Sequence, residues 1–433
     1  MEGKLPACLQ VPLLHRRQGR IGANRKKGVI TTLSKKTAVL VAAALCLSVG
    51  IASGATTTPP KRVRHSGVKA PAGRRTTSHV TSNGQPSHVP TAKLAKQPVR
   101  GKHRPAPAYN PWRVSSFGNP TERDNPAGED PTVRAVAVRA LGNWNGAVVV
   151  VNPNNGRILS VVNQPLALSG AFTPCSTIKP VVAAGALKEG IITSETKLRV
   201  FGPHGGRITL RDALAHSNNM FFAKLGEMLG FKRVEEYAQE FGLGEKAGWD
   251  IAGESPGVFP SAPPKEGGVG LMTSFGSAIE ITPLQQAAIA SAIANGGTLY
   301  WLQYPRTPEE VESLEPRVRR RLDNLSAVLP SLKEGMAAAV LYGTARSAYN
   351  PLEAVYGKTG TCSEDGAHLG WFESYAADPE SKYVVVVLLR GGKMMFGPHA
   401  AEIAGNIYRD LLDHDKMAAA VNRTALAVGL IQR

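Results

Sequence analysis

Hydrophobic and polar positions divide the chain into segments of different character. Residues 37–60 carry no charge and include an apolar run over residues 38–52. The next stretch is dominated by Thr, Ser, Pro, Gly, Lys and Arg, a composition that cannot bury enough surface to offset its ordering entropy. From residue 131 onward, apolar residues recur with the periods of strands and helices. The pattern predicts a basic tail, an apolar segment, a disordered stalk, a folded domain and a C-terminal tail over residues 1–36, 37–55, 56–130, 131–415 and 416–433.

Strand patterns stand at both ends of the folded domain, and helical patterns lie between them. Residues 146–152 and 157–162 are rich in β-branched residues and flank a turn signal, which predicts a hairpin. Apolar residues at three- and four-residue spacing predict helices over residues 174–189, 209–216, 219–229, 232–240, 282–294 and 325–341. The last third predicts strands over 355–361, 369–376 and 383–389, then a helix over 399–412. This order favours an α+β fold, an antiparallel sheet carrying helices, over a repeat of βαβ units.

The positive charge of the chain is concentrated in its first quarter. Residues 1–113 hold 21 Lys and Arg and a single acidic residue, Glu2, whereas residues 114–433 hold 30 basic and 32 acidic residues. The basic character therefore belongs to the tail, and we predict no nucleic-acid binding. None of the four cysteines has metal-ligand spacing, so the sequence predicts no metal site and no cofactor.

The apolar segment at residues 37–55 predicts a membrane anchor. About 20 residues of helix span a hydrocarbon core of ~30 Å. Nine Lys and Arg precede the segment, so the positive-inside rule keeps the N-terminus in the cytoplasm and exports the rest of the chain. A cleaved signal peptide is the alternative, because residues 52–55 are small enough for a cleavage site. Both interpretations place the folded domain on the outer, periplasmic side of the cytoplasmic membrane.

The pair Ser176 and Lys179 forms a Ser-x-x-Lys motif at the predicted start of a helix. Residues three apart lie on one helical face, so the amine can reach the hydroxyl. A serine hydroxyl is a poor nucleophile until a base removes its proton, and a partly desolvated lysine can be that base. The motif therefore predicts nucleophilic catalysis.

Two further motifs lie downstream of the Ser-x-x-Lys pair. The run from Ser217 to Asn219 lies 41 residues after Ser176, and a Lys-Thr-Gly-Thr run extends from Lys358 to Thr361 at the end of a strand-like stretch. The glycine in this run allows a ligand to approach the strand closely. Any one of these short motifs is weak evidence, but the order and context of all three support a single site.

Together, the three motifs resemble those of the penicillin-binding protein transpeptidase domain, within the serine acyl-transferase or β-lactamase-like superfamily. The resemblance covers about residues 145–412 and includes the runs at 152–159, 281–287 and 368–372. It implies an α+β fold whose antiparallel sheet is flanked by helices, with an inserted all-helical lobe. The membrane anchor and the disordered stalk would precede this domain.

The resemblance also implies a D,D-transpeptidase acting on peptidoglycan stem peptides that end in D-Ala-D-Ala. Ser176 would attack the penultimate D-Ala carbonyl and become acylated, while Lys179 takes its proton. Ser217 would relay the proton to the leaving amine, and Asn219 would hold the substrate peptide or Lys179. β-Lactams would acylate the same serine as covalent inhibitors.

The strand motif supplies the binding groups in this scheme. Lys358, Thr359 and Thr361 would bind the terminal carboxylate of the substrate beside Gly360. The N–H groups of Ser176 and Thr361 would form the oxyanion hole, where removal of one donor costs ~3 to 4 kcal/mol. Lys358 also places a second cation near Lys179, which would keep that amine neutral.

Related activities stay open as alternatives. A D,D-carboxypeptidase or a class D-like β-lactamase or sensor would use the same acyl-enzyme. Class A β-lactamases need a glutamate that activates water, and no segment resembles their Glu-x-x-Leu-Asn run. Asn219 stands where class D enzymes usually have an apolar residue, which favours transfer to an amine. A non-catalytic peptidoglycan-binding scaffold is the alternative of another class, and the intact motifs argue against it.

Cys175 and Cys362 each adjoin a residue that the resemblance places in the oxyanion hole. If the N–H groups of Ser176 and Thr361 face one oxyanion, the two cysteines come within bridging range, for which Cα atoms must be ~4.4 to 6.8 Å apart. A disulfide would persist outside the cytoplasm. We predict this bond, with two small buried thiols as the alternative.

Overall fold

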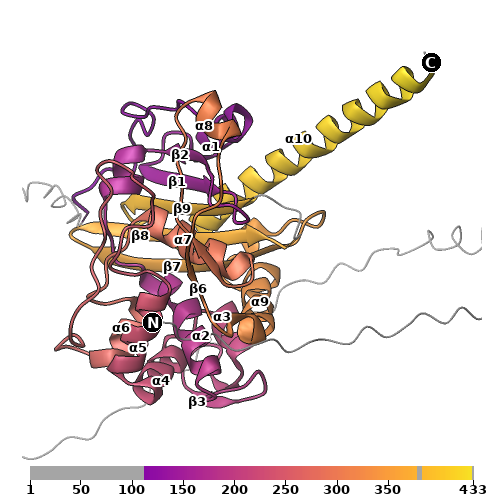
Figure 1. The fold of residues 1–433 in the computed structure, drawn as a ribbon. Helices are drawn as coiled ribbons and strands as arrows, with labels where there is room; N and C mark the ends of the chain where they lie inside the picture. Colours follow the sequence, from indigo (N-terminus) through magenta and orange to yellow (C-terminus); the bar gives the residue numbers. More distant parts are fainter. Residues whose placement is uncertain (1–111, 378–382, 432–433) are drawn as a thin grey trace, which may run out of the picture. The chain divides into compact units, whose positions relative to one another are not determined.

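The computed structural model describes residues 112–377 and 383–431, with side chains as far as residue 417. At its centre lies a five-stranded sheet in the order β2-β1-β9-β8-β7, in which all neighbours are antiparallel (Figure 1). Its strands are β1 (Gly146–Val151), β2 (Ile158–Val162), β7 (Val355–Glu364), β8 (Ala367–Ala376) and β9 (Val384–Gly391). The predicted α+β class with an antiparallel sheet is confirmed.

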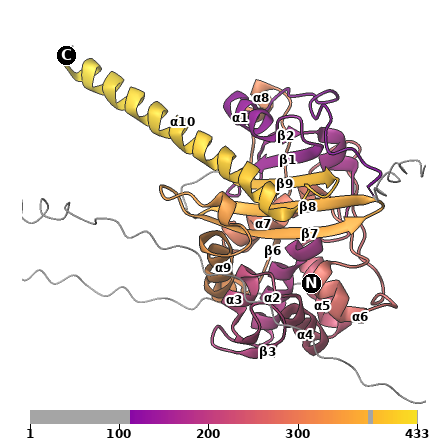
Figure 2. The ribbon, with the colours of Figure 1, turned by 180° about the vertical axis from the view of Figure 1, so that it is seen from behind.

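Helices cover both faces of the sheet, which explains why β1 and β9 are apolar at nearly every position. Successive strand residues point to opposite faces, and Val149 and Val148 accordingly enter two different hydrophobic cores. Helix α7 (Pro283–Ala294) packs on the face of Val149, whereas α1 (Pro131–Leu141) and the first half of α10 (Gly397–Ile431) cover the other face (Figures 1 and 2). A strand buried on both sides shows a continuous apolar run instead of alternation.

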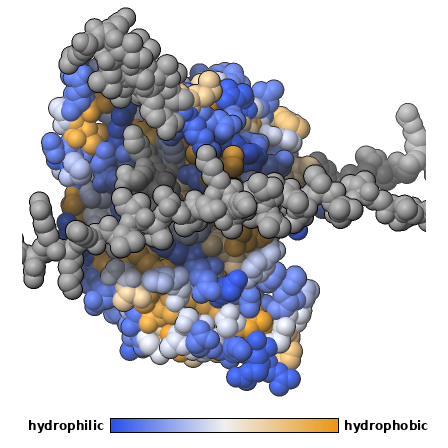
Figure 3. Space-filling model, turned by 90° about the vertical axis from the view of Figure 1, so that its right-hand side faces the viewer, coloured by the Kyte–Doolittle hydropathy of each residue, from blue (hydrophilic) through white to orange (hydrophobic). Residues whose placement is uncertain are grey.

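A helical lobe lies beside the β7 edge of the sheet (Figure 1). Its helices are α2 (Lys179–Lys188), α3 (Leu210–Ala215), α4 (Asn219–Leu229), α5 (Phe231–Glu240), α6 (Gly268–Phe275) and α9 (Leu325–Leu341). Two small hairpins and a short helix complete the fold, namely β3 (Leu198–Val200) with β4 (Gly206–Ile208), β5 (Thr298–Tyr300) with β6 (Val318–Arg321), and α8 (Pro308–Glu312). Seen from the side, the lower, helical part shows apolar patches within a hydrophilic surface (Figure 3).

The folded domain begins earlier than the sequence predicts. The stalk is predicted to continue to residue 130, but residues 112–130 lie against the domain. The backbone N–H of Arg113 donates to the Gly366 carbonyl at 2.7 Å, and that of Gly392 donates to Ser116 Oγ at 2.9 Å. The boundary of the domain therefore moves from residue 131 to at least residue 112.

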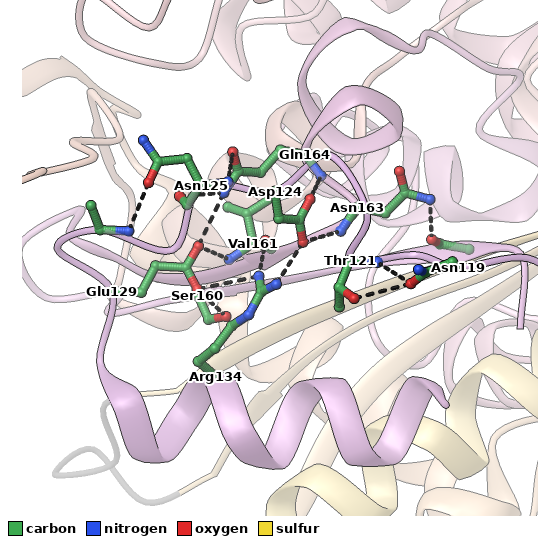
Figure 4. A network of polar contacts seen from close by, with 12 residues as sticks. Asn119, Thr121, Asp124, Asn125, Glu129, Arg134, Ser160, Val161, Asn163 and Gln164 are labelled. Atoms are coloured by element: carbon green, nitrogen blue, oxygen red, sulfur yellow. Dashed lines mark hydrogen bonds and ion pairs between the residues drawn. The ribbon is translucent and has the colours of Figure 1, made fainter. Parts of the chain in front are cut away.

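Polar contacts hold much of this N-terminal segment (Figure 4), to which Phe117 adds a stacked contact with Trp144. Arg134 lies 2.7 Å from the carboxylate of Asp124 and 3.5 Å from that of Glu129. Asp124 also accepts the backbone N–H of Gln164 at 2.7 Å, and Glu129 accepts the Ser160 hydroxyl at 2.8 Å. Such contacts leave no hydrophobic period in the sequence, which is why the pattern analysis misses them.

The C-terminal helix is also longer than predicted. The sequence predicts a helix end near residue 412 and a tail over residues 416–433, but α10 continues to Ile431 and extends beyond the sheet in Figures 1 and 2. Its second half contains no proline and is rich in alanine and leucine, which favour helix.

The predicted anchor at residues 37–55 and the stalk before residue 112 lie outside the described residues. Within the described residues, no helix combines the length and the hydropathy needed to cross a bilayer.

Candidate active site

Ser176 lies in a turn of 3₁₀-helix, Cys175–Ile178, immediately before α2 begins at Lys179. Cys175 has a φ of 53°, a left-handed conformation that residues other than glycine rarely adopt and that is common at functional sites. Pro180 lies in the first turn of α2, where a missing N–H is tolerated. A tight turn at the N-terminal end of α2 therefore positions the serine, which is 7% exposed.

The Lys179 amine is fully buried and contacts four oxygen atoms. Its Nζ lies 2.9 Å from Ser176 Oγ, 2.8 Å from the Ser217 carbonyl, 3.0 Å from Ser217 Oγ and 2.6 Å from Asn219 Oδ1. Carbonyl and amide oxygens can only accept, so they take the two N–H groups of a neutral amine. The remaining lone pair is then free to accept the proton of the Ser176 hydroxyl.

The surroundings of Lys179 favour this neutral form. Burial lowers its pKa well below the ordinary value of 10.5, and the nearby Lys358 cation lowers it further. The Phe222 ring centroid lies 5.3 Å from the amine. Within the described part of the chain, the ion pairs include neither Lys179 nor Lys358. Lys179 can therefore act as a base at neutral pH.

The Ser217 hydroxyl lies between the two lysines. Lys358 Nζ donates to Ser217 Oγ at 2.8 Å and to the Thr359 carbonyl at 2.8 Å. Burial lowers the Lys358 pKa to about 7. Ser217 has a φ of 53°, and the side chain of the next residue, Asn218, caps α4, so a helix start holds this serine in place.

Strand β7 packs directly on the turn that carries Ser176. A disulfide joins Cys362 of this strand to Cys175, with their Cα atoms 5.6 Å apart. A Cβ atom at Gly360 would lie only 2.9 Å from the Pro174 carbonyl oxygen. The sequence predicts that this glycine allows a ligand to approach, and contact between the strand and the turn also requires it.

The threonines of the Lys-Thr-Gly-Thr run make contacts within the protein. Thr359 Oγ1 lies 2.6 Å from Thr344 Oγ1, and Thr361 Oγ1 accepts the backbone N–H of Gly397 at 2.8 Å. The second contact joins the end of the motif to the start of α10. The structure thus brings the three predicted motifs to one place and connects them to the sheet and to its covering helix.

Two polar residues near this cluster were missed by motif analysis. Gln286 of α7 and Glu373 of β8 are buried, and the Gln286 amide donates to the Glu373 carboxyl group. Their signal in the sequence is a glutamate inside a predicted apolar strand, a residue type that is almost never buried without a partner.

Comparison with known proteins places this geometry in a family. Residues 146–413 match the family model described as the penicillin-binding protein transpeptidase domain. The chain belongs to this family. One relative is Stage V sporulation protein D of Bacillus subtilis (strain 168), which is 31% identical over 344 residues. The match covers 65% of this chain and 52% of that protein. Peptidoglycan D,D-transpeptidase FtsI of Escherichia coli (strain K12) is 23% identical, covering 65% and 55%.

Solved structures of the transpeptidase family share the fold. The transpeptidase domain of Burkholderia pseudomallei penicillin-binding protein 3 superposes with a TM-score of 0.58 at 22% identity, covering 67% of this chain and 96% of that one. Penicillin-binding protein 2 of Pseudomonas aeruginosa gives a TM-score of 0.56 at 22% identity, covering 66% and 77%. This chain spans about half the length of the full-length relatives it matches.

Proposed function

We propose that this protein is a serine-type D,D-transpeptidase that acts on peptidoglycan stem peptides ending in D-Ala-D-Ala. The observation that carries the proposal is the buried Lys179 amine, which lies 2.9 Å from Ser176 Oγ and forms no ion pair with a carboxylate of the described residues. A neutral amine in this position makes the serine a nucleophile. The name of one relative, peptidoglycan D,D-transpeptidase FtsI of Escherichia coli, supports the same reaction class.

In the first half-reaction, Ser176 Oγ attacks the penultimate D-Ala carbonyl, and its proton passes to Lys179 Nζ. The tetrahedral intermediate then breaks its C–N bond, which leaves an ester on Ser176. The departing D-Ala amine takes its proton from Ser217, and Lys179, 3.0 Å from Ser217 Oγ, replaces that proton. An acceptor amine reverses these steps, forms the cross-link and restores the Ser176 hydroxyl.

Lys358 has two roles in this scheme. Its charge keeps Lys179 deprotonated, and its ammonium group binds the terminal carboxylate of the substrate together with Thr359, Gly360 and Thr361. Backbone N–H groups of Ser176 and Thr361 stabilise the oxyanion, at ~3 to 4 kcal/mol for each donor removed. Cys175 and Cys362, the residues next to these two donors, form a disulfide. This bond keeps the turn and the strand at the separation that the oxyanion hole needs.

Transfer to an amine is favoured over hydrolysis by the composition of the site. Among the described residues, the groups in hydrogen-bond contact with Lys179 are hydroxyls, a carbonyl and an amide. A hydrolytic β-lactamase needs a further base that activates water for deacylation. The acyl-enzyme is therefore long-lived unless an acceptor amine arrives, and β-lactams act as covalent inhibitors.

We also propose that residues 37–55 anchor the chain in the cytoplasmic membrane with the catalytic domain outside. The charge asymmetry around this segment supports this orientation. Protease added to intact spheroplasts should degrade the domain and spare a membrane-bound N-terminal fragment. Protection of the domain from protease would contradict the proposed topology.

The test of the catalytic proposal is acylation by a fluorescent penicillin, with mass spectrometry to locate the adduct. We expect one adduct on the peptide containing Ser176, and none in Ser176→Ala. A stem pentapeptide with an acceptor amine should give cross-linked product, whereas nitrocefin should turn over slowly. An adduct elsewhere, or none, would refute the site. Release of D-Ala without cross-linked product would indicate a carboxypeptidase.

A further inference from the structure

Glu373 is a buried acidic group that the proposed reaction does not use. It lies in the middle of β8, and its side chain is 0% exposed. One carboxyl oxygen accepts the Gln286 amide, and the other has no hydrogen-bond partner among the described residues. Burying a carboxyl group is unfavourable unless its contacts compensate. The position therefore calls for a reason beyond packing.

The first reason is its position opposite Lys358. In the register of β7 and β8, Glu373 pairs directly with Lys358. Directly opposite residues of an antiparallel pair lie on the same face of the sheet. The negative charge of Glu373 raises the Lys358 pKa, while burial lowers it to about 7. Burial raises the pKa of Glu373 itself to about 8.

The second reason is a connection to the turn that carries the nucleophile. The Gln286 amide donates to Glu373 from one end, and its Oε1 accepts the Thr177 hydroxyl at 2.9 Å. Thr177 is the residue after Ser176, and its Oγ1 also lies 2.7 Å from the Pro174 carbonyl. A chain of buried polar contacts thus runs from Glu373 through α7 to the turn of Ser176.

We propose that Glu373 is a positioning residue for acyl transfer, which holds the positive charge on Lys358 and, through Gln286 and Thr177, fixes the turn that presents Ser176. This inference rests on the proposed function, because it assigns to Glu373 a part in that same reaction. Its carboxylate acts through Lys358 without an N–O contact of 4.0 Å or less. Glu373 ionises in the pH range in which Lys358 loses its proton, so its developing negative charge opposes that loss and extends the alkaline limb to higher pH.

Other charged or titratable groups lie near this pair or near Tyr375, which interacts with Glu373. They are Lys179 on α2, Lys333 on α9, Tyr356 on β7, Tyr375 on β8 and Tyr408 on α10. Burial raises the pKa values of Tyr375 and Tyr408, so both phenols stay neutral. Lys333 and Tyr356 remain in place in every variant below, so a difference between variants reports the substituted group.

The test is the pH dependence of acylation by a fluorescent penicillin between pH 6 and pH 9. Glu373→Gln keeps the size and the amide contact but removes the charge, so Lys358 should lose its proton at lower pH. We expect rates within about twofold of wild type at pH 6 and about tenfold slower at pH 8.5, equal to a shift of about one pH unit in the alkaline limb.

Two variants separate charge from structure. Gln286→Met breaks the polar chain and keeps Glu373, so it should slow acylation already at pH 6, where Glu373→Gln should not. Ser374→Ala removes a buried hydroxyl that donates to the Val385 carbonyl, so it should change stability and leave the pH profile unchanged. If Glu373→Gln fails to fold, Glu373→Val combined with Gln286→Met removes both polar groups, and comparison of its alkaline limb with that of Gln286→Met alone isolates the effect of Glu373.

The outcomes are distinct. A lack of acylation in the wild-type protein would refute the proposed function itself. Normal wild-type acylation with superimposable pH profiles for wild type and Glu373→Gln would refute the role of Glu373 alone. A loss of rate that is equal at every pH would show that Glu373 is structural, and would also overturn the inference.

Discussion

Two clusters of buried charged groups in this molecule are built on opposite plans. In the N-terminal network, Arg134 is paired with Asp124 and Glu129, whose side chains are each 1% exposed. In the active site, two buried lysines face each other across the Ser217 hydroxyl, and among the described residues no carboxylate oxygen lies within 4.0 Å of either amine. Groups of opposite charge meet in the first cluster, whereas two amines meet in the second.

The two arrangements serve different purposes: the paired charges stabilise the fold, and the unpaired amines make the site reactive. Loss of the partner of a buried charge is strongly destabilising. A buried amine without a carboxylate loses its proton more easily and becomes a base at neutral pH. We therefore expect substitutions in the N-terminal network to change unfolding, and those in the active site to change acylation.

The largest effect is expected from Lys179→Met. Removal of the base should slow acylation by roughly 10²- to 10⁴-fold, the usual contribution of general base catalysis. The melting temperature should not fall, because an uncompensated buried amine is replaced by an apolar group of similar size. Fluorescent-penicillin kinetics and thermal unfolding measure the two quantities. Lys188→Met on the same helix is the control, and a Lys179→Met rate within tenfold of wild type would contradict the assignment.

Arg134→Met should give the opposite result. It leaves two buried carboxylates without their cation, which should lower the free energy of unfolding by about 3 to 5 kcal/mol. The acylation rate per folded molecule should stay at the wild-type value. Arg139→Met is the matched control, because its pair with Asp410 is exposed and should contribute less than about 1 kcal/mol. Equal urea midpoints for the two variants would remove the distinction between the clusters.

Cys362→Ser tests whether the disulfide stabilises the active-site region, in which the two lysines form no ion pairs among the described residues. The disulfide closes a loop between residues 187 positions apart, so its loss should lower the free energy of unfolding by about 2 to 4 kcal/mol. Denaturant unfolding of oxidised wild type, reduced wild type and the variant gives the measurement. Reduced wild type should match the variant. Two reactive thiols at these positions in denatured, unreduced protein would show that the bond is absent.

The smallest effect is on the pH dependence of stability. The pKa of Lys179 is lowered in the folded state, so the unfolded state binds more protons between the folded value and the ordinary value of 10.5. The folded wild type therefore gains stability as pH rises through this window, by at most about 1.4 kcal/mol per pH unit. The stability advantage of Lys179→Met over wild type should shrink toward pH 10. A constant difference would show that Lys179 is charged in the folded protein.

Local patterns predicted most of the elements near the site. The apolar run of β9 and the turn signal between β1 and β2 indicate strands, and the helix over residues 219–229 is predicted with the bounds that the structure shows. Such elements bury one face or both faces. The buried positions therefore appear in the sequence as apolar residues that recur at the period of a helix or a strand. Helix α1 was missed although its N-cap, Asp130, accepts two backbone N–H groups, because its apolar positions adjoin a polar segment.

Contacts between distant polar groups could not be predicted in the same way. Asp124 bonds to the backbone of Gln164, and Glu373 lies opposite Lys358, but neither pair shares a helical or strand period. Their partners are chosen by the packing of whole elements. For the same reason, the sequence indicated Ser176 and Lys179 as a pair, while the place of Ser217 between two lysines needed the fold.

The sequence by itself determined the reactive groups, the segments that form the sheet and the charge that separates the tail from the domain. These follow from residue types and short spacings, because side-chain chemistry and local periodicity are properties of neighbouring residues. Tertiary structure alone decided which charges are buried without a counter-ion and which are paired. Burial and distance set the proton affinity of Lys179, and both arise only when strand β7, the Ser176 turn and the start of α4 pack together.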